Sequence, residues 1–187
     1  MEQAHFYSFG IYRYSEVIGM RMIPYDRRAA VAYAHAWAYG RNPAFYDYEK
    51  LGGDCTNFAS QCVYAGSGIM NFTPTYGWYY IDSNNKAPAW TGVPYFYNFM
   101  TREDESVGPI AIRSTIAQVL PGDVVQLSFT GEEWNHTPVI VAVRQPTPDG
   151  IYVAAHSYDA DNRPLSSYEY HDIRFLHYVG VRVNHII

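Results

Sequence analysis

One segment constrains the fold of this chain more than any other: Leu51-Gly-Gly-Asp-Cys-Thr-Asn-Phe-Ala-Ser-Gln-Cys-Val-Tyr-Ala-Gly66. Its two glycines form a flexible lead-in that allows close approach of the backbone. Asp54 is a good helix N-cap residue, because its carboxylate can accept hydrogen bonds from the free amides of a first helical turn. The segment therefore predicts a helix over about residues 55–65, with Cys55 at its first position and Gly66 just beyond its end.

Cys55 lies on the apolar face of this predicted helix, since apolar residues follow it at offsets of three, four, seven and eight. A helix N-terminus lowers the pKa of a thiol, and its unpaired amides can stabilise an oxyanion. The position therefore suits a nucleophile, although most free cysteines are simply small buried residues. Cys62 is the second cysteine. On one helix the two Cα atoms would lie about 10 Å apart, too far for a disulfide, so we expect two free thiols.

The composition of the whole chain excludes several classes of protein. A length of 187 residues with 48% hydrophobic residues favours one domain with a packed core. The formal charge of −5 argues against nucleic acid or an anionic membrane as the main partner. No apolar run approaches the ~18 residues of a membrane span. The first residues lack the apolar core of a signal peptide, so either the protein is cytoplasmic or a leader has been removed.

The order of the predicted elements indicates an α+β fold. Residues 1–23 are expected to form an arm or short strand of unknown role, followed by a single domain over residues 24–187. Helices come first in that domain: one capped by Asp26, the cysteine helix, and a short helix at Val93–Met100. Strands follow, over residues 123–129, 136–143, 151–157 and 177–184. Helices followed by such strands are typical of an antiparallel sheet covered by helices.

A cysteine nucleophile needs a base, and the base needs a third group to orient it. His136 begins an apolar strand after a polar loop, which places it at a sheet edge where a helix N-terminus could meet it. The third group is either His156 or Asp159. Even-with-even pairing of the hairpin puts His156 on the face of His136, whereas odd pairing puts Asp159 there. The sequence leaves this register open. We predict His156, because it lies within a regular strand and Asp159 lies in a predicted turn.

Taken together, these motifs resemble the putative amidase domain family, a branch of the papain-like cysteine hydrolases that includes NlpC-type peptidases and CHAP amidases. The resemblance spans about Tyr25 to Arg182. The motifs that carry it are Gly53-Asp-Cys-Thr-Asn-Phe-Ala-Ser-Gln61, Pro121-Gly-Asp-Val-Val-Gln126, His136 with its strand, and Ile151 to His156.

The resemblance implies a papain-like fold, with the nucleophile helix packed on an antiparallel sheet. It implies a catalytic triad of Cys55, His136 and His156 that hydrolyses amide bonds without a cofactor or a metal. It implies a peptide or peptidoglycan-like substrate from the bacterial cell wall, and hence a location outside the cell or at its surface.

Two other classes of function compete with the enzyme. The chain has 19 tyrosines and four tryptophans, and a non-catalytic module of the same fold could bind peptide or glycan with the aromatic loop over residues 76–97. In either case we expect Trp78 and Tyr79 to line a groove beside Cys55, with local packing as the alternative. A metal site of Cys55, His136 and His156 is the third hypothesis, although these residues lack compact ligand spacing.

Overall fold

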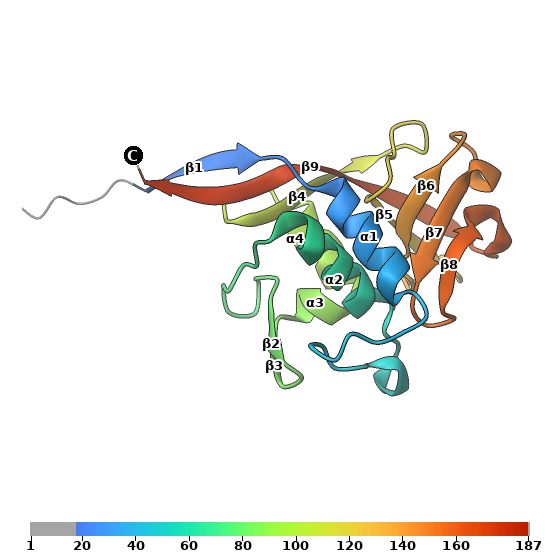
Figure 1. Ribbon diagram of the computed structural model, residues 1–187, viewed down its shortest axis with the longest axis horizontal. Coiled ribbons are helices and arrows are strands. Elements are labelled where there is room, and N and C mark those ends of the chain that lie inside the picture. The colour runs from blue at the N-terminus through green and yellow to red at the C-terminus, as the bar shows by residue number, and fades with distance from the viewer. Residues whose placement is uncertain (1–17, 187) are drawn as a thin grey trace, which may run out of the picture.

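The computed structural model describes residues 18–186 and consists of helices packed on one face of an antiparallel sheet (Figure 1). This confirms the predicted α+β class. The helices are α1 (Arg27–Trp37), α2 (Cys55–Ser67), α3 (Pro88–Thr91) and α4 (Val93–Met100), with short 3₁₀ turns at Glu49–Leu51, Pro148–Gly150 and Leu165–Ser167.

The main sheet has seven strands in the order β1-β9-β5-β6-β7-β8, and β4 also pairs with β9. Its strands are β1 (Ile18–Ile23), β4 (Gly108–Ser114), β5 (Val124–Ser128), β6 (Val139–Val143), β7 (Ile151–Ala155), β8 (Ala160–Pro164) and β9 (Asp172–Ile186). The small hairpin of β2 (Tyr80–Asp82) and β3 (Asn85–Lys86) stands apart. In Figure 1, β1 and β9 extend together beyond the helices.

The sheet separates two hydrophobic clusters. Residues of α1, α2 and α4 join inward-facing strand residues such as Val139 in the first cluster. Leu127, Ile140 and Val153 belong to the second cluster, together with Leu165 and Tyr168 from the segment after β8. Alternation along the strands produces this division, because successive side chains point to opposite faces. The face that a residue occupies therefore decides whether it can meet the nucleophile helix.

The helix boundaries largely follow the sequence signals. Asp26 caps α1, since its carboxylate accepts from the Ala29 amide at 3.0 Å. The predicted bounds of α4 are confirmed. The predicted end of α2 is wrong, because the helix continues to Ser67 and ends at Gly68 in the left-handed conformation. Gly66 instead allows α2 to pack closely against Tyr25, because a Cβ atom at this position would come within 2.4 Å of the Tyr25 ring.

The small β2–β3 hairpin and two strands of the main sheet, β4 and β8, were absent from the sequence prediction. β8 lies in a stretch rich in turn-forming residues, and its Asn162 has a positive φ of 54°. β4 follows a polar connector and is held by its long pairing with β9. In both cases pairing with a distant strand overrides weak local propensity. Of the predicted N-terminal arm, the described part forms β1 on β9, and residues 1–17 lie outside the described range.

Candidate active site

Helix α2 begins at Cys55, as predicted, but Asp54 does not cap it through its side chain. The Asp54 carboxylate instead accepts from the Tyr48 amide and the Asn57 side chain, both at 2.9 Å, and from the His156 ring at 2.6 Å. The first helical hydrogen bond runs from the Phe58 amide to the Asp54 carbonyl. The amides of residues 55–57 are therefore outside the helical ladder, and the Asp54 side chain does not cap them.

The residues that follow Cys55 in the motif serve mainly to hold α2 in place. The Thr56 hydroxyl lies 3.0 Å from the Thr137 hydroxyl and ties the helix to the segment that carries His136, which precedes β6 and pairs with Leu127 by an isolated bridge. The Asn57 side chain accepts from the Trp90 indole at 2.8 Å. Most of the motif is thus explained by positioning of the helix.

Cys55 is only 7% exposed, and its thiol rests against the backbone next to His136. The thiol donates to the Asn135 carbonyl, with 3.9 Å between sulfur and oxygen. Burial raises the pKa of Cys55, and hydrogen bonds from Thr56 and the Thr137 amide oppose this only in part. The pKa of Cys55 therefore lies above the ordinary value of a thiol, because burial removes the hydration that a thiolate needs. This direction is opposite to the lowering expected from a helix N-terminus.

His136 is 4% exposed and packs between the rings of Phe129 and Tyr168, with centroids 6.1 and 5.5 Å away. Its Nε2 atom is buried and has no hydrogen-bond partner among the described residues. Burial lowers the pKa of His136 to about 4, and the positive charge of Arg163 adds to this effect. His136 is therefore a neutral imidazole near pH 7, with a free ring nitrogen.

The backbone brings His136 to Cys55, but the side chains are not hydrogen-bonded to each other in residues 18–186. His136 pairs with Leu127, which belongs to the cluster on the far face of the sheet. Residues paired across antiparallel strands share a face. The His136 ring therefore leaves the strand on the face away from α2, whereas the next residue, Thr137, contacts α2.

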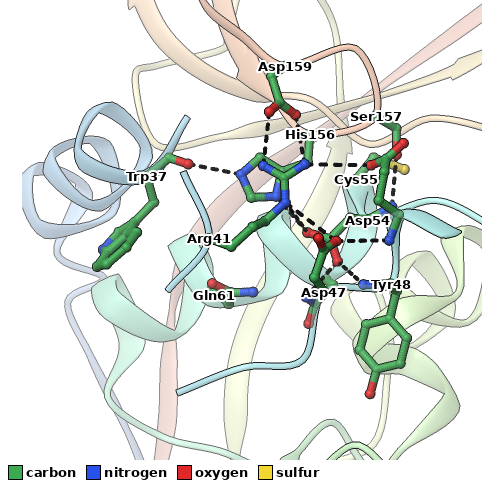
Figure 2. A network of polar contacts seen from close by, with 12 residues as sticks. Trp37, Arg41, Asp47, Tyr48, Asp54, Cys55, Gln61, His156, Ser157 and Asp159 are labelled. Atoms are coloured by element: carbon green, nitrogen blue, oxygen red, sulfur yellow. Dashed lines mark hydrogen bonds and ion pairs between the residues drawn. The ribbon is translucent and has the colours of Figure 1, made fainter. Parts of the chain in front are cut away.

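His156 lies on the α2 side of the sheet and uses both ring nitrogens there (Figure 2). Nδ1 faces Asp54 at 2.6 Å, and Nε2 faces the Trp37 carbonyl at 2.9 Å. The ring also stacks on Phe58, with centroids 4.0 Å apart. Each ring nitrogen therefore has an oxygen acceptor within hydrogen-bond distance. No ring nitrogen of His156 remains for His136, so the direct contact we expected between the two histidines is not formed.

The register explains why neither predicted third residue reaches His136. Val139 pairs with Ala154, so the hairpin pairs odd with even residues at this end. The even register that favoured His156 is therefore wrong. Asp159 does not replace it, because its carboxylate takes two hydrogen bonds from Arg41, at 2.9 and 3.0 Å.

A polar network around Asp54 was not foreseen (Figure 2). The Ser157 hydroxyl accepts from the Asp54 amide at 2.8 Å and donates to Glu49 at 2.9 Å. Arg41 Nε lies 3.8 Å from the Asp54 carboxylate. Nothing local in the sequence marks these residues, because the loop before α2 and the turn after β7 meet only in the tertiary structure.

The groove predicted from the aromatic loop is wrong for Trp78. Its indole is fully buried and donates to Ser60 at 2.9 Å, inside the core between α2 and α4. Tyr79 is half-buried and packs against Phe72 with ring centroids 5.4 Å apart. The alternative of local packing therefore explains Trp78.

A cavity of about 540 Å³ opens beside His136. Arg163, Tyr168 and Glu169 line it together with Phe129. Tyr168 and Arg163 were missed by the sequence analysis, because both fall in a stretch without a regular pattern.

Within residues 18–186, no three His, Cys, Asp or Glu side chains converge as a metal site, so the hypothetical metal site is not formed there. None of the helices in this part of the chain is long and apolar enough to cross a bilayer.

Comparison with known proteins identifies the family of the chain. The model of the putative amidase domain matches residues 24–179. The chain belongs to the putative amidase domain family. It is 32% identical over 124 residues to the uncharacterized protein YhbB of Bacillus subtilis (strain 168). That match covers 65% of this chain but 39% of YhbB, so the chain spans well under half the length of this relative. No solved structure matches the chain.

Proposed function

We propose that this protein hydrolyses amide bonds in peptide or peptidoglycan-like substrates, with Cys55 as nucleophile and His136 as base. The observation that carries the proposal is the position of the Cys55 thiol. It is on the first residue of α2 and rests against the backbone that bears His136, 3.9 Å from the Asn135 carbonyl. Membership in the putative amidase domain family supports the reaction class. The papain-like arrangement of helix and sheet belongs to the same proposal.

General-base activation starts from a neutral thiol and a neutral imidazole, and the two pKa shifts keep both groups in those forms near pH 7. Burial raises the pKa of Cys55 and lowers the pKa of His136 to about 4. A neutral imidazole can accept the thiol proton as the sulfur attacks the carbonyl carbon. The imidazolium then gives this proton to the leaving amine, and the neutral ring activates water to hydrolyse the thioester. The first-turn amides of α2, which no side chain caps, can stabilise the oxyanion.

Proton transfer requires His136 and Cys55 to come closer than they are in the resting protein. Catalytic hydrogen bonds are often long before substrate binds and tighten in the complex. Substrate in the cavity beside His136 would displace solvent there and favour rotation of the ring toward the sulfur. A single water between the two groups would serve the same purpose.

His156 has a different part in this proposal: it positions the nucleophile. Its ring joins the Asp54 carboxylate to the Trp37 carbonyl and stacks on Phe58, so that α1, α2 and β7 meet behind Cys55. Asp54 directly precedes Cys55. A change in His156 therefore acts on the placement of the thiol and the first-turn amides.

Turnover of peptidoglycan fragments, followed by chromatography and mass spectrometry, tests the proposal. Wild-type protein should release amine products and form a transient acyl adduct on Cys55. Cys55→Ala should abolish both with an unchanged circular dichroism spectrum, since one small side chain replaces another. Cys62→Ala is the matched control, because Cys62 is also a buried thiol of α2. Turnover by Cys55→Ala near the wild-type rate would refute the proposal.

The alternative, a binding module without catalysis, is favoured by the missing hydrogen bond between Cys55 and His136. In that case Cys55 is an inert buried thiol like Cys62. Iodoacetamide labelling separates the two functions. A catalytic Cys55 should react faster than Cys62 and more slowly after His136→Gln. Equal labelling of both thiols, unchanged by this substitution, would support the binding module.

A further inference from the structure

Arg163 is held in place without a carboxylate partner. Its Nε donates to the Ser167 hydroxyl at 2.7 Å and its Nη2 to the Ser167 carbonyl at 3.0 Å. The guanidinium also stacks over the Tyr168 ring, 3.8 Å from the centroid. None of the ion pairs within residues 18–186 uses Arg163, unlike Arg27 and Arg41, which bind carboxylates. The unused N–H groups in the guanidinium plane are therefore donors whose direction is fixed in advance.

This guanidinium lines the same cavity as His136. The two groups are close enough for the charge of Arg163 to lower the pKa of His136. Tyr168 lies between them in the packing, stacked under Arg163 and 5.5 Å from the His136 ring centroid. Its hydroxyl is buried and has no hydrogen-bond partner in the described residues. The cavity thus combines a fixed positive charge with two unpartnered polar atoms, on His136 and Tyr168.

The charge balance of the cavity favours an anionic ligand. The chain as a whole carries −5, yet this cavity contains an unpaired guanidinium beside a neutral imidazole. Glu169 is the one acidic residue in its lining; it is exposed and forms no ion pair with Arg163 within the described residues. A planar guanidinium presents paired N–H donors that match the two oxygens of a carboxylate.

We propose that the cavity beside His136 is a subsite for a carboxylate of the amide substrate, bound by Arg163 on the Tyr168 platform. The inference deepens the proposed function, on which it rests, by assigning an acidic group to the part of the substrate next to the scissile bond. A carboxylate bound there would place the amide near His136, because one cavity holds both contacts.

Equilibrium binding of two small probes tests the subsite separately from catalysis. N-acetylalanine carries a carboxylate, and N-acetylalaninamide has nearly the same shape without the charge. Binding is followed by NMR shifts of the His136 and Tyr168 rings. The anionic probe should bind about tenfold more tightly, as expected for a charge-assisted hydrogen bond open to solvent. This preference should shrink as salt is added.

Three variants make the test specific. Arg163→Gln should remove the preference for the anionic probe, whereas Glu169→Gln should increase it. Arg144→Gln is the matched control, because Arg144 also stacks on a tyrosine, Tyr152, but does not line the cavity. Equal binding of the two probes by the wild-type protein would overturn the inference. So would a preference that survives Arg163→Gln, or one that Arg144→Gln removes equally. Failure of turnover with intact anion preference would refute only the catalytic proposal.

Discussion

The two histidines of the candidate site are both buried, but they differ in their hydrogen bonding. His156 is 1% exposed and has an acceptor at each ring nitrogen. His136 is 4% exposed, has no partner at Nε2 among the described residues, and lies beside a cavity. The comparison teaches that burial alone does not identify a reactive histidine. A fully partnered ring joins parts of the fold, whereas an unpartnered ring beside a cavity retains a free nitrogen for chemistry.

Burial of the two histidine rings also differs in its effect on the free energy of folding. An unsatisfied polar group in the interior costs about 1–3 kcal/mol, and His136 is such a group. The His156–Asp54 pair offsets its desolvation with further hydrogen bonds, since Asp54 also accepts from Tyr48 and Asn57. The unpartnered Nε2 atom of His136 does not add to stability. We propose that its role is general-base catalysis.

Substitution of His136 should produce the largest effect on turnover. His136→Gln removes the base, and general-base catalysis contributes roughly 10²–10⁴-fold. We therefore expect kcat to fall by about that factor while the melting temperature changes little. Steady-state kinetics and thermal unfolding on the same preparation provide the check. If the kcat of His136→Gln stays close to the wild-type value, His136 is not the base, and the distinction drawn between the two histidines is wrong.

Substitution of His156 should have the largest effect on stability. His156→Ala leaves the Asp54 carboxylate buried and without its closest partner, and breaking a buried pair costs about 3–5 kcal/mol. Urea unfolding measures this difference. His136→Ala is the comparison variant and should cost less than His156→Ala. If the two variants are equally stable, the network around Asp54 does not hold the nucleophile helix.

The pH dependence of stability should contain a contribution from His136. Its pKa falls from 6.5 when unfolded to about 4 when folded, so the unfolded chain binds more protons between these values. Stability contributed by the neutral ring is present above pH 6.5 and is lost as the pH falls toward 4. The total is about 3 kcal/mol. Urea unfolding across this range should give a shallower pH slope for His136→Phe than for the wild type; identical slopes would contradict the assignment.

Asp159 should show the smallest effect. Its carboxylate pairs with Arg41 at a partly exposed site and does not touch His136. Such pairs contribute about 0–1 kcal/mol. Asp159→Asn should therefore shift the free energy of unfolding by less than about 1 kcal/mol and leave kcat within about twofold, as measured beside His156→Ala. A loss of kcat as large as that of His136→Gln would restore Asp159 as the orienting residue.

Local sequence determined the elements whose signals lie within a few residues. Asp26 caps α1 as its position predicted, and Cys55 is the first residue of α2 because a glycine-rich loop ends there. The α+β class followed from the order of helical and strand periodicities along the chain. These features depend on backbone preferences and side-chain spacing, which each segment carries with it.

Only the tertiary structure decided which groups meet. The register that pairs Val139 with Ala154 sends His156 to the α2 side and away from His136, and a one-residue slip would reverse this. The pKa of the Cys55 thiol was likewise decided by its burial in the assembled protein, which raises it. Arg163 reaches the cavity from β8, which pairs with β7 at the edge of the sheet, and Tyr168 reaches it from the segment after β8. Pairing register, desolvation and long-range contacts are properties of the assembled chain, and no single segment encodes them.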